Sequence, residues 1–273
     1  MPENNQTKKN TKGTALITGA SSGIGKEFAK KIAALDFNVI LVARRKQLLE
    51  ELAAELEKQY PIKAEILVAD LATEPDITSV EDRIKSGNIT ILINNAGFGV
   101  RGPFISTDLS KRLNMIKVHI TTPVRFCHAA LPKMISQNKG AIINVSSLNA
   151  FMYAPGSSIY SSSKMFLVRF TQVLNLESPK KIRIMALCPG FTHTGFHSTE
   201  EYDDWDKTNI PKFLWMNASK VVSQSLNALR KGKVVFVPGF KNRIFLSLYR
   251  FPLTSLLIKS ILIKGAKNRE IID

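Results

Sequence analysis

The sequence has little cysteine and no long apolar run, and each absence excludes a class of protein. Only two cysteines occur in 273 residues, Cys127 and Cys188, and both have apolar neighbours, so buried reduced thiols are expected rather than a disulfide framework. No run of 18 or more uncharged apolar residues occurs, so a membrane-spanning helix is not expected. Residues 1–12 are polar and lack the apolar core of a signal peptide, which favours a disordered tail and a cytoplasmic location.

Acidic residues are also scarce. The 22 Asp and Glu stand against 38 Lys and Arg, which gives a net charge of +16 and a pI of 9.9. Such a balance favours contact with anions such as nucleic acid, an anionic membrane surface or a phosphorylated ligand. The cations are spread along the chain with some crowding at both ends, and no nucleic-acid-binding module is visible. We therefore expect a solvated basic surface and no nucleic-acid partner.

Strand-type and helix-type segments alternate along the chain. Apolar strand-type runs occupy residues 14–18, 38–43, 64–69, 90–94, 140–145, 182–187 and 234–238. Helical spacing of apolar residues occupies 26–35, 46–59, a stretch ending at 85, 108–137 and 158–176, with Pro123 and Pro132 predicting kinks in the fourth. This alternation predicts an α/β fold with a doubly wound, Rossmann-type parallel sheet of about seven strands and helices on both faces.

A glycine-rich turn lies between the first strand and the first helix. Gly19, Gly23 and Gly25 follow the pattern G-x-x-x-G-x-G, with Ser21 and Ser22 between them. Such a turn lets backbone amides approach a pyrophosphate, and the helix N-terminus adds partial positive charge. A plain glycine turn is the alternative. Ligands of open α/β sheets bind at the carboxyl ends of strands, which is where this turn falls.

The end of the second strand bears on the choice of cofactor. Ala43 is followed by Arg44 and Arg45, where an acidic side chain would take the ribose hydroxyls of NAD. A guanidinium suits a 2′-phosphate, so NADP(H) is predicted, unless the arginines merely begin the next helix. Asp70, after the third strand, either reaches the adenine amino group or caps the next turn.

Tyr160 and Lys164 stand four residues apart on one helix face. An ammonium beside a phenol favours the phenolate, so such a phenol could exchange a proton with a substrate oxygen near neutral pH. By itself the pair describes a solvated helix face equally well.

Several motifs occur together in one order: Thr18-Gly-Ala-Ser-Ser-Gly-Ile-Gly25, Asn94-Asn-Ala-Gly97, Ser147, Tyr160-x-x-x-Lys164 and Pro189-Gly190. In this combination residues 13–240 resemble the short-chain dehydrogenase/reductase family. The resemblance implies that Tyr160 is the general acid for a carbonyl oxygen, that Lys164 lowers its pKa and holds the nicotinamide ribose, and that Ser147 binds the substrate oxygen. A carbonyl or alcohol substrate and a homodimer or homotetramer are implied as well.

The resemblance also implies which residues contact NADP(H): Gly19, Ser21, Ser22, Gly23, Ile24, Gly25, Arg44, Arg45, Asp70, Leu71, Asn94, Ala96, Gly97, Tyr160, Lys164, Pro189, Gly190, Phe191, Thr192 and Thr194. One position departs from the family pattern, because His119 stands where an asparagine usually supports a water next to the lysine. The imidazole either takes over that water or a proton relay, or is a tolerated substitution.

The remaining segments bear on substrate and partners. Five aromatic residues between 195 and 216 would form an apolar wall for a ketone, aldehyde or acyl chain, or else pack on the domain: Phe196, Tyr202, Trp205, Phe213 and Trp215. His193 and His197 lack a third ligand, so no metal site is predicted. Residues 241–273 form a basic amphipathic extension that either lies on a membrane, covers the pocket or contacts a second subunit. The alternative function is a catalytically silent dinucleotide-binding scaffold or sensor with a membrane-peripheral tail.

Overall fold

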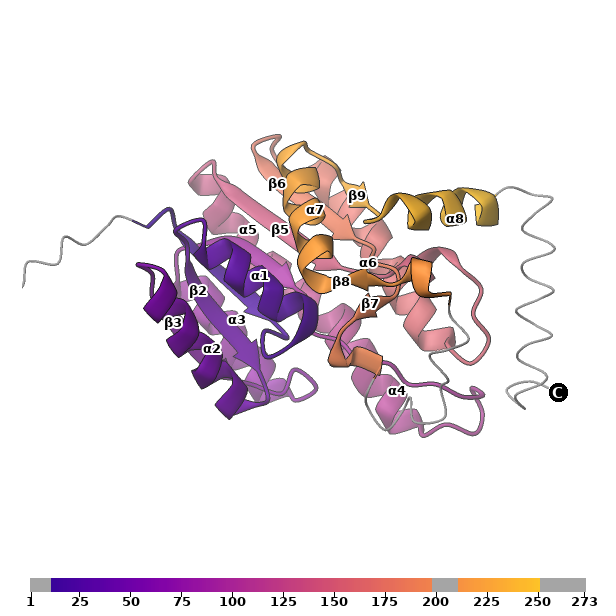
Figure 1. Ribbon diagram of the computed structural model, residues 1–273. Helices are drawn as coiled ribbons and strands as arrows, with labels where there is room; N and C mark the ends of the chain where they lie inside the picture. Colours follow the sequence, from indigo (N-terminus) through magenta and orange to yellow (C-terminus); the bar gives the residue numbers. More distant parts are fainter. Residues whose placement is uncertain (1–10, 198–210, 251–273) are drawn as a thin grey trace, which may run out of the picture.

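A single parallel sheet of seven strands forms the centre of the molecule (Figure 1). The computed structural model describes residues 11–197 and 211–250. The strand order is β3-β2-β1-β4-β5-β6-β9, and all neighbouring strands pair in parallel. The strands are β1 Thr14–Thr18, β2 Asn38–Ala43, β3 Ala64–Val68, β4 Ile89–Asn94, β5 Gly140–Val145, β6 Ile182–Leu187 and β9 Val235–Phe236. The predicted doubly wound parallel sheet is therefore confirmed.

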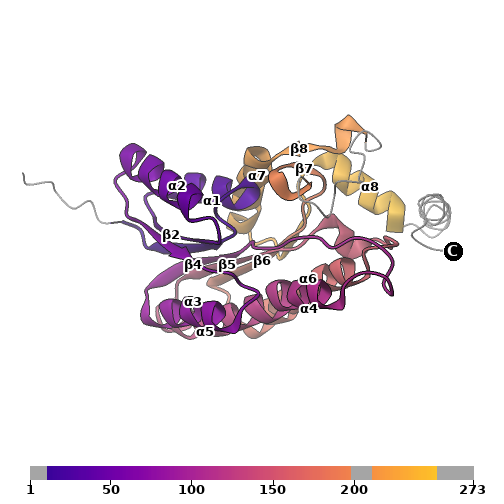
Figure 2. The same cartoon turned by 90° about the horizontal axis from the view of Figure 1, so that it is seen from below.

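Helices cover both faces of this sheet (Figure 2). They are α1 Gly23–Ala33, α2 Lys46–Gln59, α3 Glu74–Ser86, α4 Leu109–Ile116, α5 Thr122–Ser136, α6 Ser158–Glu177, α7 Ala218–Arg230 and α8 Phe240–Arg250. Apolar residues of α1, α2 and α7 pack on one face, and those of α3, α5 and α6 on the other. The central strands are thus buried on both sides, which is why they read as unbroken apolar runs rather than alternating ones.

The predicted long helix at 108–137 is two helices joined by a π-helical turn, Lys117–Thr121. Pro123 lies in the first turn of α5, where its missing N–H costs little, and Pro132 lies inside α5. The irregularity therefore sits at the π turn that carries His119, a position that no proline marks. Single π turns of this kind are frequent at functional sites.

Helix α8, at the start of the predicted C-terminal extension, packs against the rest of the domain. Leu246 and Tyr249 of α8 are buried, and the Tyr249 hydroxyl accepts a 2.7 Å hydrogen bond from the backbone N–H of Tyr153. The first ten residues of the extension, 241–250, thus pack on the main domain as part of α8. Two short strands, β7 Thr192–His193 and β8 Met216–Asn217, pair nearby, and two residues each are too few for a sequence pattern.

Some expectations fall outside the described residues. These are the tail at 1–10, the aromatic residues Tyr202 and Trp205, and the extension from 251 to 273. Within 11–197 and 211–250, no helix is long and apolar enough to cross a membrane.

A chain of buried amides connects the sheet to α6. The Nδ2 of Asn94 donates to Oδ1 of Asn144 at 2.8 Å, and the Nδ2 of Asn144 donates to Oγ1 of Thr171 at 2.9 Å. All three side chains are buried, so each depends on these partners instead of water. The chain holds β4, β5 and α6 in register, below the segments that carry the predicted site.

We expect Asn144→Ala to lower the free energy of unfolding by about 2–3 kcal/mol, because it leaves buried polar groups of Asn94 and Thr171 without partners. Urea unfolding followed by circular dichroism measures this, with Asn114→Ala on the exposed face of α4 as the control. Equal stability of the two variants would contradict a structural role for the chain.

Candidate active site

The glycine-rich turn has a backbone that only glycine adopts readily. Gly19 and Gly23 have φ values of +67° and +55°, in the left-handed region. A Cβ at Gly25 would lie 2.3 Å from the carbonyl oxygen of Gly19. Because α1 begins at Gly23, the turn brings the first amides of the helix to the carboxyl end of β1. This arrangement can accept a pyrophosphate.

Thr18 and Asn95 hold the turn against the neighbouring loop after β4. Oγ1 of Thr18 accepts the N–H groups of Asn95 and Ala96, both at 2.9 Å, and the Nδ2 of Asn95 donates to the carbonyl of Thr18 at 2.9 Å. The set of predicted NADP(H) contacts includes Asn94 but not Asn95. The side chain of Asn94 instead points inward to Asn144, so its part in the site is structural. The N-N-A-G motif alone gave no signal for which asparagine faces the loop.

Two arginines lie beside the glycine-rich turn. Arg45 donates from Nη2 to Oγ of Ser22 at 2.7 Å and to Oγ of Ser21 at 2.9 Å. The side chain of Arg44 is 72% exposed and lies 4.0 Å from the carboxylate of Asp70. Both guanidiniums flank the loop, and Arg45 also immediately precedes α2. The donor set here fits a phosphate better than a neutral ribose hydroxyl.

Asp70 caps the turn after β3, which is one of its two predicted roles, and its contact with an adenine amino group stays a prediction. Its Oδ1 accepts the backbone N–H of Ala72 at 3.0 Å, which stabilises the turn that leads toward α3. The adjacent Leu71 is buried in the core on that side of the sheet.

Helix α6 brings Tyr160 and Lys164 to the end of β5. The Nζ of Lys164 donates to the carbonyl oxygen of Val145 at 3.0 Å and lies 5.7 Å from the centroid of the Tyr160 ring. Ser146 donates from Oγ to the carbonyl of Lys164 at 2.7 Å. The Ser147 hydroxyl lies beside the Tyr160 phenol and lowers its pKa. The structure therefore brings together the three predicted catalytic residues, although they are separated along the chain.

Burial dominates the ionisation of this group. It raises the pKa of the Tyr160 phenol, and the Ser147 hydroxyl opposes that shift. It also lowers the pKa of the Lys164 ammonium to about 8. Burial therefore outweighs the influences that lower the pKa of the phenol, and a lowering by Lys164 stays a prediction. A phenol that stays protonated at neutral pH can donate a proton, which suits a reduction.

His119 is fully enclosed and uses both ring nitrogens. Nε2 accepts the backbone N–H of Phe98 at 3.2 Å, which leaves the ring proton on Nδ1, 3.0 Å from Oγ of Ser163. Ser163 in turn donates to the carbonyl of Tyr160 at 2.8 Å. Burial, followed by the charge of Lys164, holds the pKa of His119 well below its ordinary value of 6.5. In this arrangement neither nitrogen remains for a water.

The segment after β6 closes over the glycine-rich turn. Thr194 lies against Gly23, where an added Cβ would come within 2.9 Å of the threonine side chain. Its Oγ1 accepts the backbone N–H of Phe196 at 3.2 Å, and the Phe196 ring lies 6.0 Å from that of Tyr160. Nearby, Thr192 donates from Oγ1 to the carbonyl of Gly190 at 3.0 Å. The predicted segment 189–194 therefore borders the turn, and Phe196, two residues beyond it, faces Tyr160.

The predicted aromatic wall is divided. Phe196 faces Tyr160, whereas Trp215 stacks on His193 with ring centroids 4.9 Å apart and contacts Phe191 at 5.4 Å. Phe213 is 59% exposed. Among the described aromatic residues, only part of the wall therefore lines the site.

Arg112 of α4 is a residue that the sequence did not single out. Its guanidinium is buried and donates to the carbonyls of Gly102 and Pro103 and to Oγ of Ser158. It therefore fixes the loop after β4 to the first turn of α6, two residues before Tyr160. Its place in the middle of an amphipathic helix gave no sequence signal.

Comparison with known proteins agrees with this geometry. The family model described as short chain dehydrogenase matches residues 13–207. The chain belongs to the short-chain dehydrogenase family. A solved structure of the family, a short-chain dehydrogenase from Sphingobium yanoikuyae in complex with NADPH, is 33% identical with a TM-score of 0.78, covering 84% of this chain and 88% of that one.

Three curated relatives of this short-chain dehydrogenase differ in their described activities. An NADP-dependent 3-hydroxy acid dehydrogenase of Schizosaccharomyces pombe is 36% identical over 72% of this chain and 78% of its own length. A very-long-chain 3-oxoacyl-CoA reductase of Anas platyrhynchos is 34% identical over 66% of this chain and 60% of its own length. An inactive hydroxysteroid dehydrogenase-like protein 1 of Homo sapiens is 30% identical over 69% of this chain and 58% of its own length. The match thus spans less than two thirds of the duck and human proteins.

We expect His119 to remain a neutral Nδ1–H imidazole at pH 6, because burial depresses its pKa. A depressed folded-state pKa means that the contribution of His119 to stability is present above the unfolded value of 6.5 and is lost as pH falls below it. Nitrogen-15 NMR of labelled histidine measures the tautomer and its titration, with the surface residue His128 as an internal comparison. An imidazolium signal for His119 at pH 6 would contradict the assigned hydrogen bonds.

Proposed function

We propose that this short-chain dehydrogenase is an NADP(H)-dependent oxidoreductase that interconverts a carbonyl and a secondary alcohol. The observation that carries the proposal is the meeting of Ser147, Tyr160 and Lys164 beside a glycine-rich turn flanked by two arginines. A proton donor, a hydrogen-bond donor for an oxygen and a cation next to a dinucleotide cradle are the groups that hydride reduction of a carbonyl requires.

The protein's own residues divide the proton chemistry. NADPH, when bound, supplies the hydride to the carbonyl carbon. Tyr160 donates its phenolic proton to the carbonyl oxygen, so that the C=O double bond becomes an alcohol and the phenolate remains. Ser147, whose hydroxyl lies beside the phenol, orients the oxygen. Lys164, held on Val145, places its charge where it stabilises that phenolate.

The residues around the turn fit NADP(H). Ser21, Ser22 and the amides at the start of α1 would hold the pyrophosphate region, and Arg44 with Arg45 would take the 2′-phosphate. No acidic residue follows β2 to select a free ribose. The NADPH-bound relative of known structure and the NADP-dependent yeast relative support this preference.

The substrate we propose is a 3-oxoacyl or 3-hydroxyacyl compound. Two relatives are named for this pair of oxidation states, one a 3-oxoacyl-CoA reductase and the other a 3-hydroxy acid dehydrogenase. Phe196 next to Tyr160 offers an apolar surface to the chain of such a compound. Reduction is the direction that a protonated phenol favours.

His119 acts, on this proposal, as a positioning residue rather than a relay. Its two hydrogen bonds connect the loop at Phe98 with the turn of α6 that holds Tyr160. A rigid link between these elements keeps the phenol at a fixed distance from the dinucleotide cradle.

The alternative is a catalytically silent dinucleotide-binding protein, and the human relative described as inactive supports it. The complete Ser147, Tyr160 and Lys164 set, with its hydrogen bonds in place, favours the enzyme. We also propose a cytoplasmic homodimer or homotetramer, for which the exposed apolar side chains of α4 and α6, such as Leu113 and Leu176, provide contact surface.

We expect Tyr160→Phe to reduce kcat for a 3-oxoacyl substrate by at least about 1000-fold, because it removes the proton donor.

For the unmodified protein, kcat/KM for reduction should fall above pH 8, where Lys164 loses its charge, since the phenolate that forms then lacks its cation. NADPH oxidation followed at 340 nm measures both, with Tyr153→Phe as the control for a partly exposed tyrosine. Equal rates for Tyr160→Phe and the unmodified protein would refute the mechanism.

We expect Arg44→Ala to raise the KM for NADPH about 10- to 100-fold and to leave that for NADH nearly unchanged, because only NADPH carries the 2′-phosphate. Arg45→Ala should weaken both cofactors, since Arg45 also holds Ser21 and Ser22. Steady-state kinetics with each cofactor measures the ratio, and Lys46→Ala, one residue further on, is the matched control. An unchanged NADPH-to-NADH ratio in Arg44→Ala would remove Arg44 from the cofactor site.

A further inference from the structure

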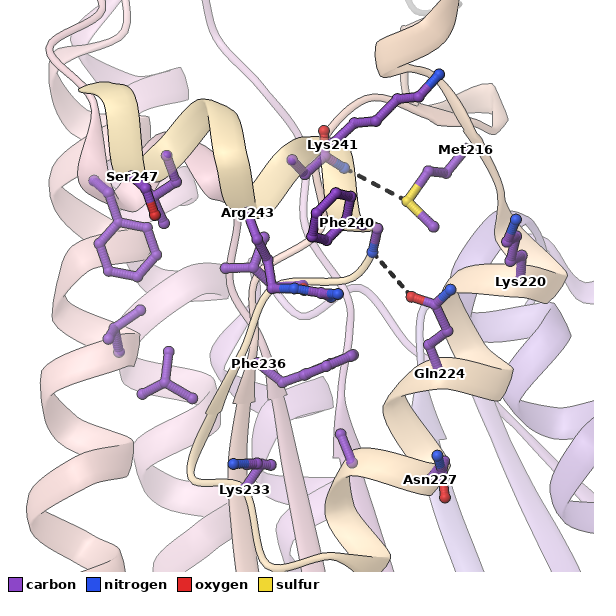
Figure 3. Close-up of a pocket in the computed structure, with 18 of the residues that line it drawn as sticks. Met216, Lys220, Gln224, Asn227, Lys233, Phe236, Phe240, Lys241, Arg243 and Ser247 are labelled. Carbon is purple, nitrogen blue, oxygen red and sulfur yellow. Dashed lines mark hydrogen bonds between the residues drawn. The ribbon is translucent and has the colours of Figure 1, made fainter. Parts of the chain in front are cut away.

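A large groove opens at the β9 edge of the sheet, away from the catalytic residues (Figure 3). It has a volume of about 1880 Å³ and lies between α6, α7, β9 and α8. None of Ser147, Tyr160, Lys164 or the glycine-rich turn lines it. Figure 3 shows Phe236 of β9 and Arg243 of α8 in its middle, with Gln224 and Asn227 of α7 on one wall.

The charged side chains that line the groove are all positive: Arg169, Lys220, Lys231, Lys233, Lys241 and Arg243. Each is exposed, and none forms an ion pair with a carboxylate in the described part of the chain. The local sequence explains this, because residues 211–250 contain eight Lys or Arg and no Asp or Glu. Half of the net charge of +16 therefore comes from 40 residues at this end of the molecule.

Apolar side chains stand at the rim and floor of the same groove. Phe213 and Phe240 line the groove and are 59% and 68% exposed. Ile244, one turn after Phe240 on α8, does not line the groove and is 43% exposed on the outer face of the helix. Lys241 lies 5.4 Å from the Phe213 ring and Arg243 lies 5.9 Å from the Phe240 ring. The opposite side of α8 is buried through Leu246. The helix is thus fixed to the protein and presents a second, partly apolar face to the solvent.

We propose that this groove and the outer face of α8 dock on an anionic phospholipid surface. The cations would take the headgroup phosphates, and Phe213, Phe240 and Ile244 would enter the boundary with the acyl chains. Exposed cations match the headgroup phosphates of such a surface, and the exposed aromatic and aliphatic side chains beside them match the acyl chains below. A membrane contact was one of three alternatives that the sequence offered for residues 241–273, and the groove adds Arg169 of α6, Lys220 of α7 and the lysines of the following loop.

Other occupants fit these observations less well. A second copy placed symmetrically on the groove would bring six cations against six cations, which like-charge repulsion opposes. The segment 251–273 of this chain carries four Lys or Arg and two acidic residues, so its own charge is also positive. Nucleic acid would satisfy the cations but would not account for the exposed Ile244 and Phe240.

Co-sedimentation of the full-length protein with vesicles tests the proposal. Vesicles of phosphatidylglycerol and phosphatidylcholine should bind it, and vesicles of phosphatidylcholine alone should not. The double variant Lys231→Glu/Lys233→Glu should lower the partition coefficient at least about tenfold, since each surface cation contributes about fivefold. Phe240→Ser should lower it by a smaller factor at the same charge.

The control carries the same change of charge elsewhere. Lys58→Glu/Lys63→Glu lies at the α2 and β3 side, far from the groove along the sheet order, and should retain most of the binding. An equal loss in both double variants would mean that net charge alone acts, and would overturn the proposal.

Three further results would also overturn it. One is unchanged vesicle binding by the groove variant, which would place the contact elsewhere. Another is displacement of the protein from vesicles by a DNA oligonucleotide at equal phosphate concentration. The third is a fall in molar mass of the groove variant by light scattering, which would make the groove a contact between copies. NADPH oxidation by the groove variant should match that of the unmodified protein, so a failure here is distinguishable from a failure of the proposed activity.

Discussion

The burial of Lys164 against the end of β5 is the constraint on which the site depends. An ammonium removed from water must keep a hydrogen-bond partner, and it finds one in the carbonyl of Val145. That bond, with the bond from Ser146 to the helix backbone, sets the rotation and height of α6 on the sheet. The position of Tyr160 one turn earlier follows from it. The same burial lowers the pKa of Lys164 and raises that of Tyr160, so structure and proton chemistry share one cause.

Around this pair, neutral hydrogen bonds take the place of further charges. His119 is neutral and links Phe98 to Ser163, while the amides of Asn94 and Asn144 link the strands to α6. Arg112 fixes the adjoining loop through backbone carbonyls. The Lys164 ammonium lies 5.7 Å from the centroid of the Tyr160 ring, among these neutral groups. The dinucleotide end differs, because Arg44 and Arg45 provide two guanidiniums that face solvent.

The positive side chains have different surroundings in two parts of the molecule, beside the glycine-rich turn and at the β9 edge of the sheet. Beside the glycine-rich turn, Arg45 is held by two serines and Arg44 lies 4.0 Å from the carboxylate of Asp70. At the β9 edge the cations lack carboxylate partners within the described residues and lie among exposed apolar groups. The first arrangement suits a small phosphate ligand, as we propose, and the second suits a broad anionic surface.

The sequence alone was enough to predict the fold class, six of the seven strands to within about a residue, and the three residues Ser147, Tyr160 and Lys164 that the structure brings together. This was possible because buried parallel strands read as apolar runs and the motifs directly follow them. It could not decide which asparagine faces the loop, what His119 bonds to, or in which direction burial moves the pKa of Tyr160. Those depend on contacts between residues far apart in the chain, such as Thr18 with Asn95 and His119 with Ser163. The groove could not be predicted from the sequence either, because Arg169 and Arg243 come to the same edge of the sheet only when the helices pack. Local pattern fixes the elements, but desolvation and side-chain pairing exist only after the elements pack.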